Sequence, residues 1–372
     1  MLQHGEYKVC TKCVMTNQRP GITFNEEGVC KPCQVAEERK KIDWDARWKE
    51  LEKLCNKHRG DGTYYDCAIT GSGGKDSHFQ VHVLKDLLGM NPLLLNIYNY
   101  SWTDTGMHNF LNWSEAYDCD VISLILKRGT AKIMTRLAFE HYGSPTLYWD
   151  RAVYSWPVRM AHQMEIPLLI YGENISYEYG GAQEETPSAA QQINNEAVPK
   201  VDPEEWIALS RNELSKQDFI TYEFDPGWLK FVNPQYLSYY VPWDGRNNAE
   251  IARRHGFRTL KHEWTREGFI EDYDQIDTAG YLVHPWLKYP KYGHARVTDI
   301  ASLWVRLGYI NRGTAVNLVK MYEGQLDQHS LDDFLVWTGY TDREFWQIVD
   351  QWYNEDIFEY EAGVWRHKFP IK

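Results

Sequence analysis

The chain has 372 residues, of which 43% are hydrophobic and 25% are charged, a composition typical of globular domains with a sizeable core. Its formal net charge is −12, which argues against a broad nucleic-acid surface because phosphate binding requires clustered Lys and Arg. No apolar run approaches the roughly 20 residues that span a membrane. The first residues also lack the apolar region of a signal peptide, so we expect a cytoplasmic protein.

Four cysteines near the N-terminus form two C-x-x-C pairs, namely Cys10 with Cys13 and Cys30 with Cys33. Sixteen residues separate the pairs, a spacing typical of a site with four thiolate ligands. Disulfides are rare in cytosolic proteins. We therefore expect residues 1–42 to form a four-cysteine module that binds structural zinc and depends on the metal to fold. An iron–sulfur cluster and a redox dithiol are the alternatives.

A glycine-rich loop follows the first expected strand, residues 64–70, and precedes a helix whose apolar stripe begins at Phe79. Glycines allow backbone N–H groups to approach an anion, and a helix N-terminus adds its positive dipole end. A lysine supplies charge to a phosphate, and a carboxylate suits Mg²⁺. The spacing is not that of a Walker A loop or of the dinucleotide fingerprint. We expect the following residues to bind ATP, with Lys75 and Asp76 also acting in catalysis and Asp76 holding Mg²⁺: Gly71, Ser72, Gly73, Gly74, Lys75, Asp76 and Ser77.

Further strands are expected at residues 92–98, 120–125 and 166–171, with helical patterns between them. This alternation predicts an α/β fold with a parallel sheet, which binds ligands at the carboxyl ends of its strands. The fourth strand is followed directly by Gly172, Glu173 and Asn174, and then by Glu178. We expect Gly172 and Asn174 to contact ATP and Glu173 and Glu178 to act in catalysis, unless this is a polar loop without chemistry. The polar stretch 183–205 is interpreted as a mobile lid or as a disordered excursion.

From Trp206 onward the chain follows helical spacing with short breaks, including residues 331–353, and it contains a basic run over residues 287–299. A basic loop at a helix entry suits a phosphate group, such as pyrophosphate or the diphosphate of a nucleotide sugar. We expect Lys291, His294 and Arg296 to bind it, with Lys291 also a catalytic candidate. A solvated turn is the alternative.

The string Ser-Gly-Gly-Lys-Asp-Ser at residues 72–77 resembles the loop of the N-type ATP pyrophosphatases, the PP-loop superfamily. Four features occur in the order seen in N-acetyl sugar amidotransferases: the Cys pairs, this loop, the Gly-Glu-Asn segment at 172–174 and the run at 291–299. Those enzymes act in surface-polysaccharide, lipopolysaccharide O-antigen and flagellin-glycan pathways. One departure is that this chain has Tyr292-Gly293-His294-Ala295-Arg296, where the family often has an aromatic-Gly-aromatic-Gly-Arg run.

The resemblance implies a PP-loop core over residues 43–240, related to the adenine-nucleotide α-hydrolases, and a mainly helical region over 241–372. It implies that an acetamido group on a nucleotide-activated sugar becomes an acetamidino group, with AMP and pyrophosphate as products. It also implies that a separate glutaminase and a cyclase-like subunit supply the ammonia. The family's zinc ligands and loop residues correspond to the cysteines and to residues 72–77 named above, and its second motif corresponds to residues 172–174.

Two other functions compete with this interpretation. A tRNA-thiolating enzyme can share the loop and the cysteine-rich module, but it requires a basic RNA surface and usually a sulfur-carrying cysteine or cluster. A regulator that only binds nucleotide is disfavoured by the intact Lys75-Asp76-Ser77. The chain shows no glutaminase motif, because Leu2 follows Met1 and neither Cys67 nor Cys119 lies between glycines.

Overall fold

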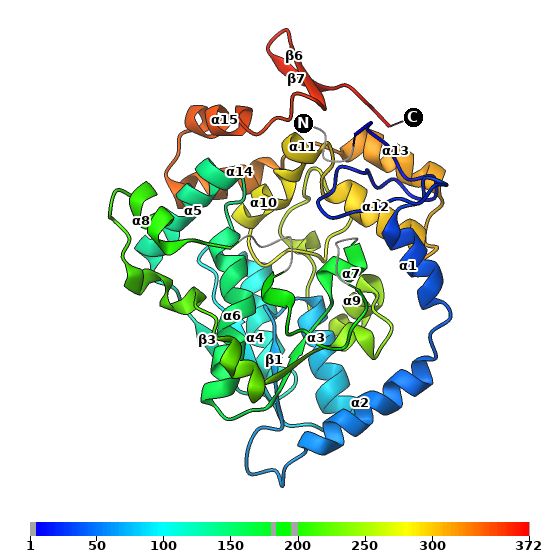
Figure 1. The fold of residues 1–372 in the computed structure, drawn as a ribbon, viewed down its shortest axis with the longest axis vertical. Coiled ribbons are helices and arrows are strands. Elements are labelled where there is room, and N and C mark those ends of the chain that lie inside the picture. Colours follow the sequence, from blue (N-terminus) through cyan, green and yellow to red (C-terminus); the bar gives the residue numbers. More distant parts are fainter. Residues whose placement is uncertain (1–4, 180–183, 195–199, 372) are drawn as a thin grey trace.

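The computed structural model describes residues 5–179, 184–194 and 200–371 (Figure 1). Its β-strands are β1 (Cys67–Thr70), β2 (Pro92–Ile97), β3 (Val121–Leu124), β4 (Leu168–Tyr171), β5 (Asn233–Tyr236), β6 (Phe358–Glu361) and β7 (Val364–His367). Its α-helices are α1 (Lys31–Arg39), α2 (Trp44–His58), α3 (Lys75–Val81), α4 (Asp104–Glu115), α5 (Arg128–Tyr142), α6 (Leu147–Gln163), α7 (Ile175–Tyr179), α8 (Pro203–Leu209), α9 (Gly245–Arg254), α10 (Val283–Trp286), α11 (Lys288–Tyr292), α12 (Arg296–Arg306), α13 (Arg312–Tyr322), α14 (Gln328–Thr338) and α15 (Asp342–Asp350).

A five-stranded parallel sheet with the order β3-β2-β1-β4-β5 forms the centre of the fold. The four strands expected from the sequence are confirmed. The fifth, β5, lies in a stretch that was expected to be helical. The order reverses direction between β1 and β4, which makes this pair the point where ligands bind on open α/β sheets. The loops after β1 and β4 therefore begin side by side at the carboxyl edge of the sheet.

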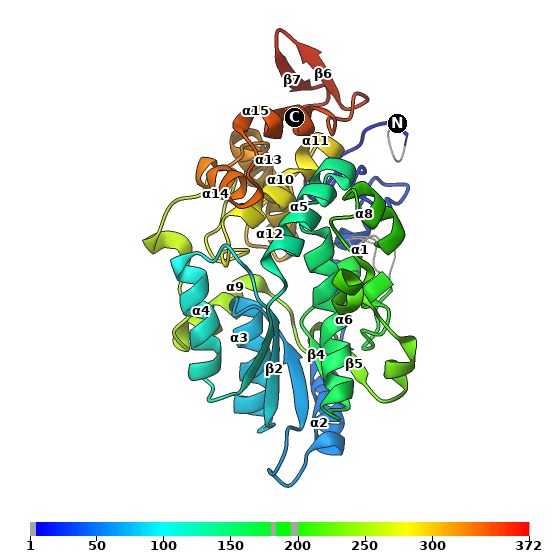
Figure 2. The ribbon, with the colours of Figure 1, turned by 90° about the vertical axis from the view of Figure 1, so that its left-hand side faces the viewer.

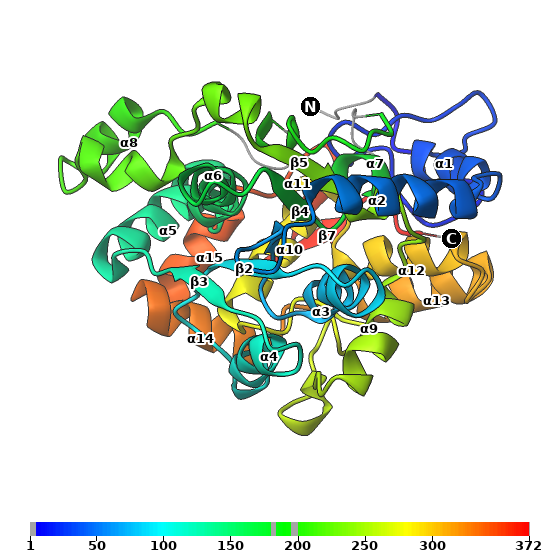
Figure 3. The ribbon, with the colours of Figure 1, turned by 90° about the horizontal axis from the view of Figure 1, so that it is seen from below.

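The two faces of the sheet bury different cores, because successive strand residues point to opposite faces. In β1, Ala68 packs with α5 and α6, whereas Cys67 and Ile69 pack with α2, α3 and α4. Figures 2 and 3 show α6 on one side of the strands and α3 and α4 on the other. Both faces are covered, which explains why β1, β2 and β4 are buried along their whole length.

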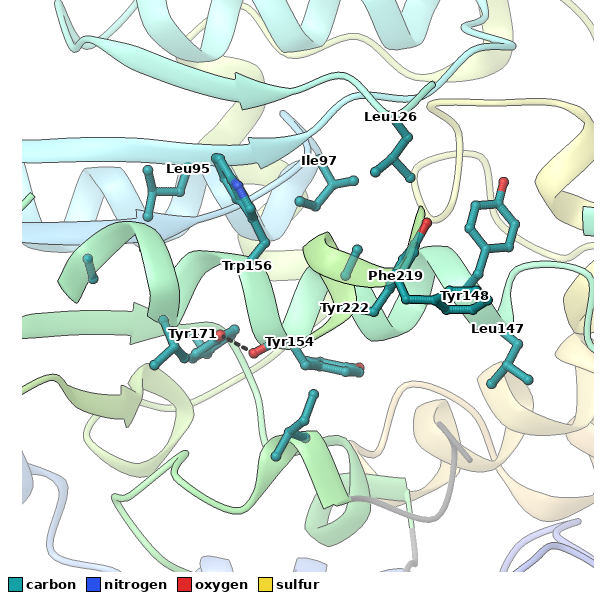
Figure 4. Close-up of a cluster of buried hydrophobic side chains, with 14 of the residues drawn as sticks. Leu95, Ile97, Leu126, Leu147, Tyr148, Tyr154, Trp156, Tyr171, Phe219 and Tyr222 are labelled. Atoms are coloured by element: carbon teal, nitrogen blue, oxygen red, sulfur yellow. Dashed lines mark hydrogen bonds between the residues drawn. The ribbon is translucent and has the colours of Figure 1, made fainter. Parts of the chain in front are cut away.

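An aromatic cluster fixes α6 against the sheet (Figure 4). Trp156 and Tyr154 of α6 lie near Leu95 of β2 and Tyr171 of β4, and the hydroxyl of Tyr171 donates to the backbone carbonyl of Tyr154 at 3.2 Å. This packing determines where the first turns of α6 lie. Those turns carry Trp149 and Asp150, which line the cavity described below.

The C-terminal helices lie over the carboxyl edge of the sheet, and the N-terminal segment lies beside α12 and α13 (Figures 1 and 2). Val14 packs with Ala301 of α12 and with Ala315 and Val316 of α13. The helical pattern expected over 331–353 is interrupted by Gly339, which has a φ of 76° and ends α14 before α15 begins. The antiparallel hairpin β6–β7 was not expected. None of the described helices is long and apolar enough to span a bilayer.

The polar stretch expected to be a lid is described over 184–194 and from residue 200. Part of it packs against the sheet: Ala189 donates its N–H to the carbonyl of Pro234 at 2.9 Å, and Ala189 and Ile193 are buried. Residues 203–209 form α8. The lid interpretation also covers residue 183 and residues 195–199, which lie outside the described residues.

Candidate active site and metal centre

The loop between β1 and α3 has a backbone that only glycine accommodates at its centre. Gly73 has a φ of 83°, and a Cβ added there would lie 2.5 Å from the Cα of Phe110. The N–H of Ser72 donates to Oγ of Ser77 at 3.0 Å, and Asn96 of β2 donates to the carbonyl of Gly71 at 2.8 Å. The loop is thus bound at both ends and passes directly against α4, as expected of a rigid anion cradle.

This loop forms one wall of a cavity of about 470 Å³. Residues 71–77 and 172–173 line it, so the structure brings together the two motifs that the sequence placed after β1 and β4. The ends of β2 and α4 line a second side. Helix α6 and the segment around Tyr281 line a third side, which is largely aromatic and apolar. The charged groups of the wall come from widely separated parts of the chain: Arg19, Lys75, Asp76, Asp150, Glu173, Asp274, Asp277, Lys288, Arg296 and Asp299.

Lys75, the loop lysine, belongs to a buried chain of charges. Its Nζ donates to Oδ2 of Asp76 at 2.5 Å and also pairs with Asp274, whose other oxygen pairs with Arg296. Burial disfavours the charge on Lys75, but the two carboxylates outweigh it and raise its pKa well above the usual range. Burial likewise acts to raise the pKa of Asp274, yet Lys75 and Arg296 hold it well below the usual range. Both side chains therefore remain charged.

Asp76 has the surroundings of a Mg²⁺ ligand. Its Oδ1 accepts from Nδ2 of Asn248 at 2.7 Å and its Oδ2 accepts from Lys75, which leaves each carboxylate oxygen a further lone pair. The buried Oδ1 of Asn248 has no hydrogen-bond partner in the described residues. Mg²⁺ prefers oxygen ligands of this kind and keeps several waters or phosphate oxygens. The residues present thus fit the ion, and Asn248 was not expected from the sequence.

Three carboxyl groups of the cavity have raised pKa values because burial disfavours their charged form. The pKa of Glu173 is raised to about 8 by burial and then by the charge of Asp76. Burial raises the pKa of Asp150 to about 7 and that of Asp277 to about 6. Carboxyl groups that titrate near neutral pH can both donate and accept a proton at neutral pH. Glu173 is thus a candidate acid or base next to the glycine-rich loop.

The raised pKa of Glu173 predicts a pH-dependent stability. The folded state binds this proton more tightly than the unfolded chain, in which the pKa of Glu173 is about 4.5. The stabilisation is therefore complete below about pH 4.5 and is lost as the pH rises through about 8. Glu173→Gln mimics the neutral acid, so its melting temperature should exceed that of the parent at pH 8.5 and approach it near pH 5. An equal difference at both pH values would contradict this assignment.

Four residues expected at the site make contacts away from the main cavity. Glu178 forms an ion pair with Arg39 of α1, and Oδ1 of Asn174 accepts the N–H of Tyr177 at 3.1 Å. Lys291 donates to the carbonyl of Gly143 at 2.7 Å, and His294 forms a hydrogen bond of 3.2 Å between its Nδ1 and Oγ1 of Thr16. Burial lowers the pKa of Lys291 to about 8 and that of His294 to about 4. None of the four lines the cavity.

The four N-terminal cysteines are brought together as the spacing predicts. Their sulfur atoms all lie within 4.8 Å of one another, with 4.0 Å between Cys10 and Cys33 and 3.7 Å between Cys13 and Cys30. A tetrahedral ion with bonds of about 2.3 Å to sulfur would separate its ligands by roughly 3.8 Å. Backbone N–H groups of Lys12, Met15 and Cys30 point at these sulfurs. The residues therefore fit a four-thiolate metal site, and zinc is the ion that this donor set favours.

Two comparisons with known proteins cover parts of the chain. A family model described as "LPS biosynthesis protein WbpG-like, C-terminal domain" matches residues 263–370, a stretch that includes Asp274, Lys288 and Arg296. An uncharacterized protein of Methanocaldococcus jannaschii, MJ1599, is 25% identical over 177 residues, which is 47% of this chain and 62% of that protein. The aligned region thus spans less than two thirds of that relative. In its C-terminal part, the chain is similar to a family of lipopolysaccharide biosynthesis proteins.

Proposed function

We propose that the chain is an ATP-dependent amidotransferase of polysaccharide biosynthesis, which converts an acetamido group of a nucleotide-activated sugar into an acetamidino group. One observation carries the proposal. The glycine-rich loop and the charged residues Asp274, Lys288 and Arg296 line the same cavity, and those three residues lie in the stretch that resembles lipopolysaccharide biosynthesis proteins. A loop suited to the phosphates of ATP thus shares one cavity with a region linked to polysaccharide pathways.

The reaction fits the groups that surround the cavity. Attack of the amide oxygen on the α-phosphorus of ATP forms a P–O bond, breaks the bond to the β-phosphate and releases pyrophosphate. Ammonia then adds at the amide carbon of the adenylated imidate, and AMP leaves with the original oxygen. Lys75 and the loop N–H groups would neutralise the leaving pyrophosphate, and Glu173 would take up a proton released from the nitrogen. Mg²⁺ held at Asp76 would reduce the charge on the phosphates.

The proposal includes the organisation expected from the sequence. Residues 1–42 would form the zinc module, residues 43–240 a PP-loop core and residues 241–372 a helical region that adds charged groups to the site. A separate glutaminase with a cyclase-like subunit would deliver the ammonia, and the reaction would take place in the cytoplasm. The strand order around the loop supports the core assignment, because both motifs meet at the point where the order reverses.

The test is AMP formation from ATP, Mg²⁺ and an ammonium salt, with a UDP-2,3-diacetamido uronic acid or unfractionated tRNA as the acceptor. We expect AMP only with the sugar, together with a sugar product lighter by the difference between O and NH. AMP formed only with tRNA would replace the proposal with a thiolase. Absence of AMP with the sugar would contradict the amidotransferase function.

A further inference from the structure

A second group of charges lies in the cavity wall, apart from the loop lysine. Asp299 of α12 accepts from Nη1 of Arg19 at 2.8 Å and also pairs with Lys288 of α11. The carboxylate is only 2% exposed, whereas the side chains of Arg19 and Lys288 are 19% and 25% exposed. The carboxylate is therefore covered by the two cations, and the trio presents a net positive charge to the cavity.

Two carboxylates divide the four cations of the cavity into two pairs. Asp274 pairs with Lys75, the loop lysine, and with Arg296. Asp299 holds Arg19 and Lys288, which come from outside the loop. The cavity wall thus contains two carboxylates, each paired with two cations, and at each of these two places an anion can replace or join the carboxylate. A reaction between ATP and a nucleotide-activated sugar requires two such places, since each substrate carries its own phosphates.

Arg19 and Lys288 retain hydrogen-bond donors for a ligand. A guanidinium has five N–H groups and an ammonium has three. In the hydrogen bonds of the described residues, Arg19 uses Nη1 and Lys288 uses Nζ, each toward Asp299. The guanidinium also lies over the ring of Tyr179, with 5.7 Å between Cζ and the ring centroid, which limits its orientation. A forked, oriented guanidinium beside an ammonium is suited to the oxygens of a diphosphate.

Arg19 belongs to the four-cysteine module, because it lies between the two cysteine pairs. The module is attached to the C-terminal region by hydrogen bonds that are buried or partly buried. Arg312 donates to the carbonyls of Cys10 and Cys13 at 3.4 and 3.1 Å, and Thr16 forms the hydrogen bond with His294 described above. The four-thiolate centre therefore fixes the backbone that carries Arg19 toward the cavity.

We propose that Arg19 and Lys288 bind the diphosphate of the nucleotide-activated acceptor, at a subsite separate from the ATP phosphates, and that the four-cysteine module thereby forms part of the acceptor site. The identity of the acceptor rests on the proposed function. In this proposal Arg19 and Lys288 take the role that the sequence suggested for Lys291 and His294. Those two residues instead form hydrogen bonds with Gly143 and Thr16.

The experiment measures binding by calorimetry to the full chain saturated with α,β-methylene-ATP and Mg²⁺. The probes are UDP and inorganic pyrophosphate. Arg19→Ala should weaken both by about tenfold or more, the loss expected for one charge-assisted contact, and should change the affinity for the ATP analogue less than about threefold. Lys75→Ala should instead weaken binding of the ATP analogue, measured by titrating the analogue alone. Lys12→Ala, an exposed change in the same module, is the matched control and should resemble the parent.

Three outcomes would overturn the inference: failure of both probes to bind beside the analogue, unchanged UDP affinity in Arg19→Ala, or binding of glucuronate in place of the diphosphates. Lys288→Met provides a second variant in case Arg19→Ala disturbs the module, and it should weaken UDP in the same way. These results are independent of turnover. If UDP binding depends on Arg19 while no AMP forms, the subsite stands and the proposed reaction fails.

Discussion

Replacement of Cys30 by alanine should abolish zinc binding and lower the free energy of unfolding by about 5 kcal/mol or more, because metal binding supplies the folding energy of a small module. Cys30 is fully buried in a cluster built mainly from the four cysteines, Met15, Ile22 and Val29. Such a core is too small to fold without the metal. The measurements are the zinc content of the purified protein and its unfolding by denaturant.

Cys55→Ala is the matched control. Cys55 is equally buried, but it belongs to the core between the sheet and α2, α3 and α4, and not to the cluster that contains the four cysteines of the metal site. Loss of its sulfur should cost about 1–2 kcal/mol through the small cavity that remains, with the zinc content unchanged. If Cys30→Ala retained both its metal and its stability, the four-thiolate centre would be refuted.

The sequence predicted β1, β2, β3 and β4 because each appears as a mostly apolar run, and β1, β2 and β4 are also buried on both faces. Strand β5 has the sequence Asn-Pro-Gln-Tyr, which lacks this signal. It lies at the edge of the sheet, where a proline is tolerated because its missing N–H is not required by a second neighbour. Hairpin β6–β7 was missed because its turn is Ala362-Gly363, both with positive φ, instead of the usual Asn-Gly or Asp-Gly signal.

In the candidate site, too, residues with a local sequence signal were found and residues without one were missed. Residues 71–77 and 172–173 were found because each group is a continuous motif at a strand end. Arg19 and Asp274 were missed because they reach the cavity only through packing of distant segments. The basic run was assigned to the site as a unit, but only some of its residues line the cavity. Lys291 instead binds the carbonyl of Gly143, the C-cap of α5, where the helix dipole favours a cation.

Asp274→Ala should lower the free energy of unfolding by about 3–5 kcal/mol, because it leaves Lys75 and Arg296 as buried cations without their common partner. The two cationic side chains are only 6% and 12% exposed, so water compensates little for the loss. Asp76 still contacts Lys75 but cannot replace the ion pair of Arg296. Thermal and denaturant unfolding of the variant and the parent measure the difference.

The same variant distinguishes an anion site from a structural ion pair. If Asp274 occupies part of the position that the phosphates of ATP take, an added anion can pair with Lys75 and Arg296 in its place. Saturating pyrophosphate should then raise the melting temperature of Asp274→Ala more than that of the parent, because binding to the folded state alone stabilises it. Asp61→Ala, a change in an exposed turn, should show the parental response. A variant that is destabilised but gains no more from pyrophosphate than the parent would mean that Lys75 and Arg296 support the fold and do not bind the phosphates.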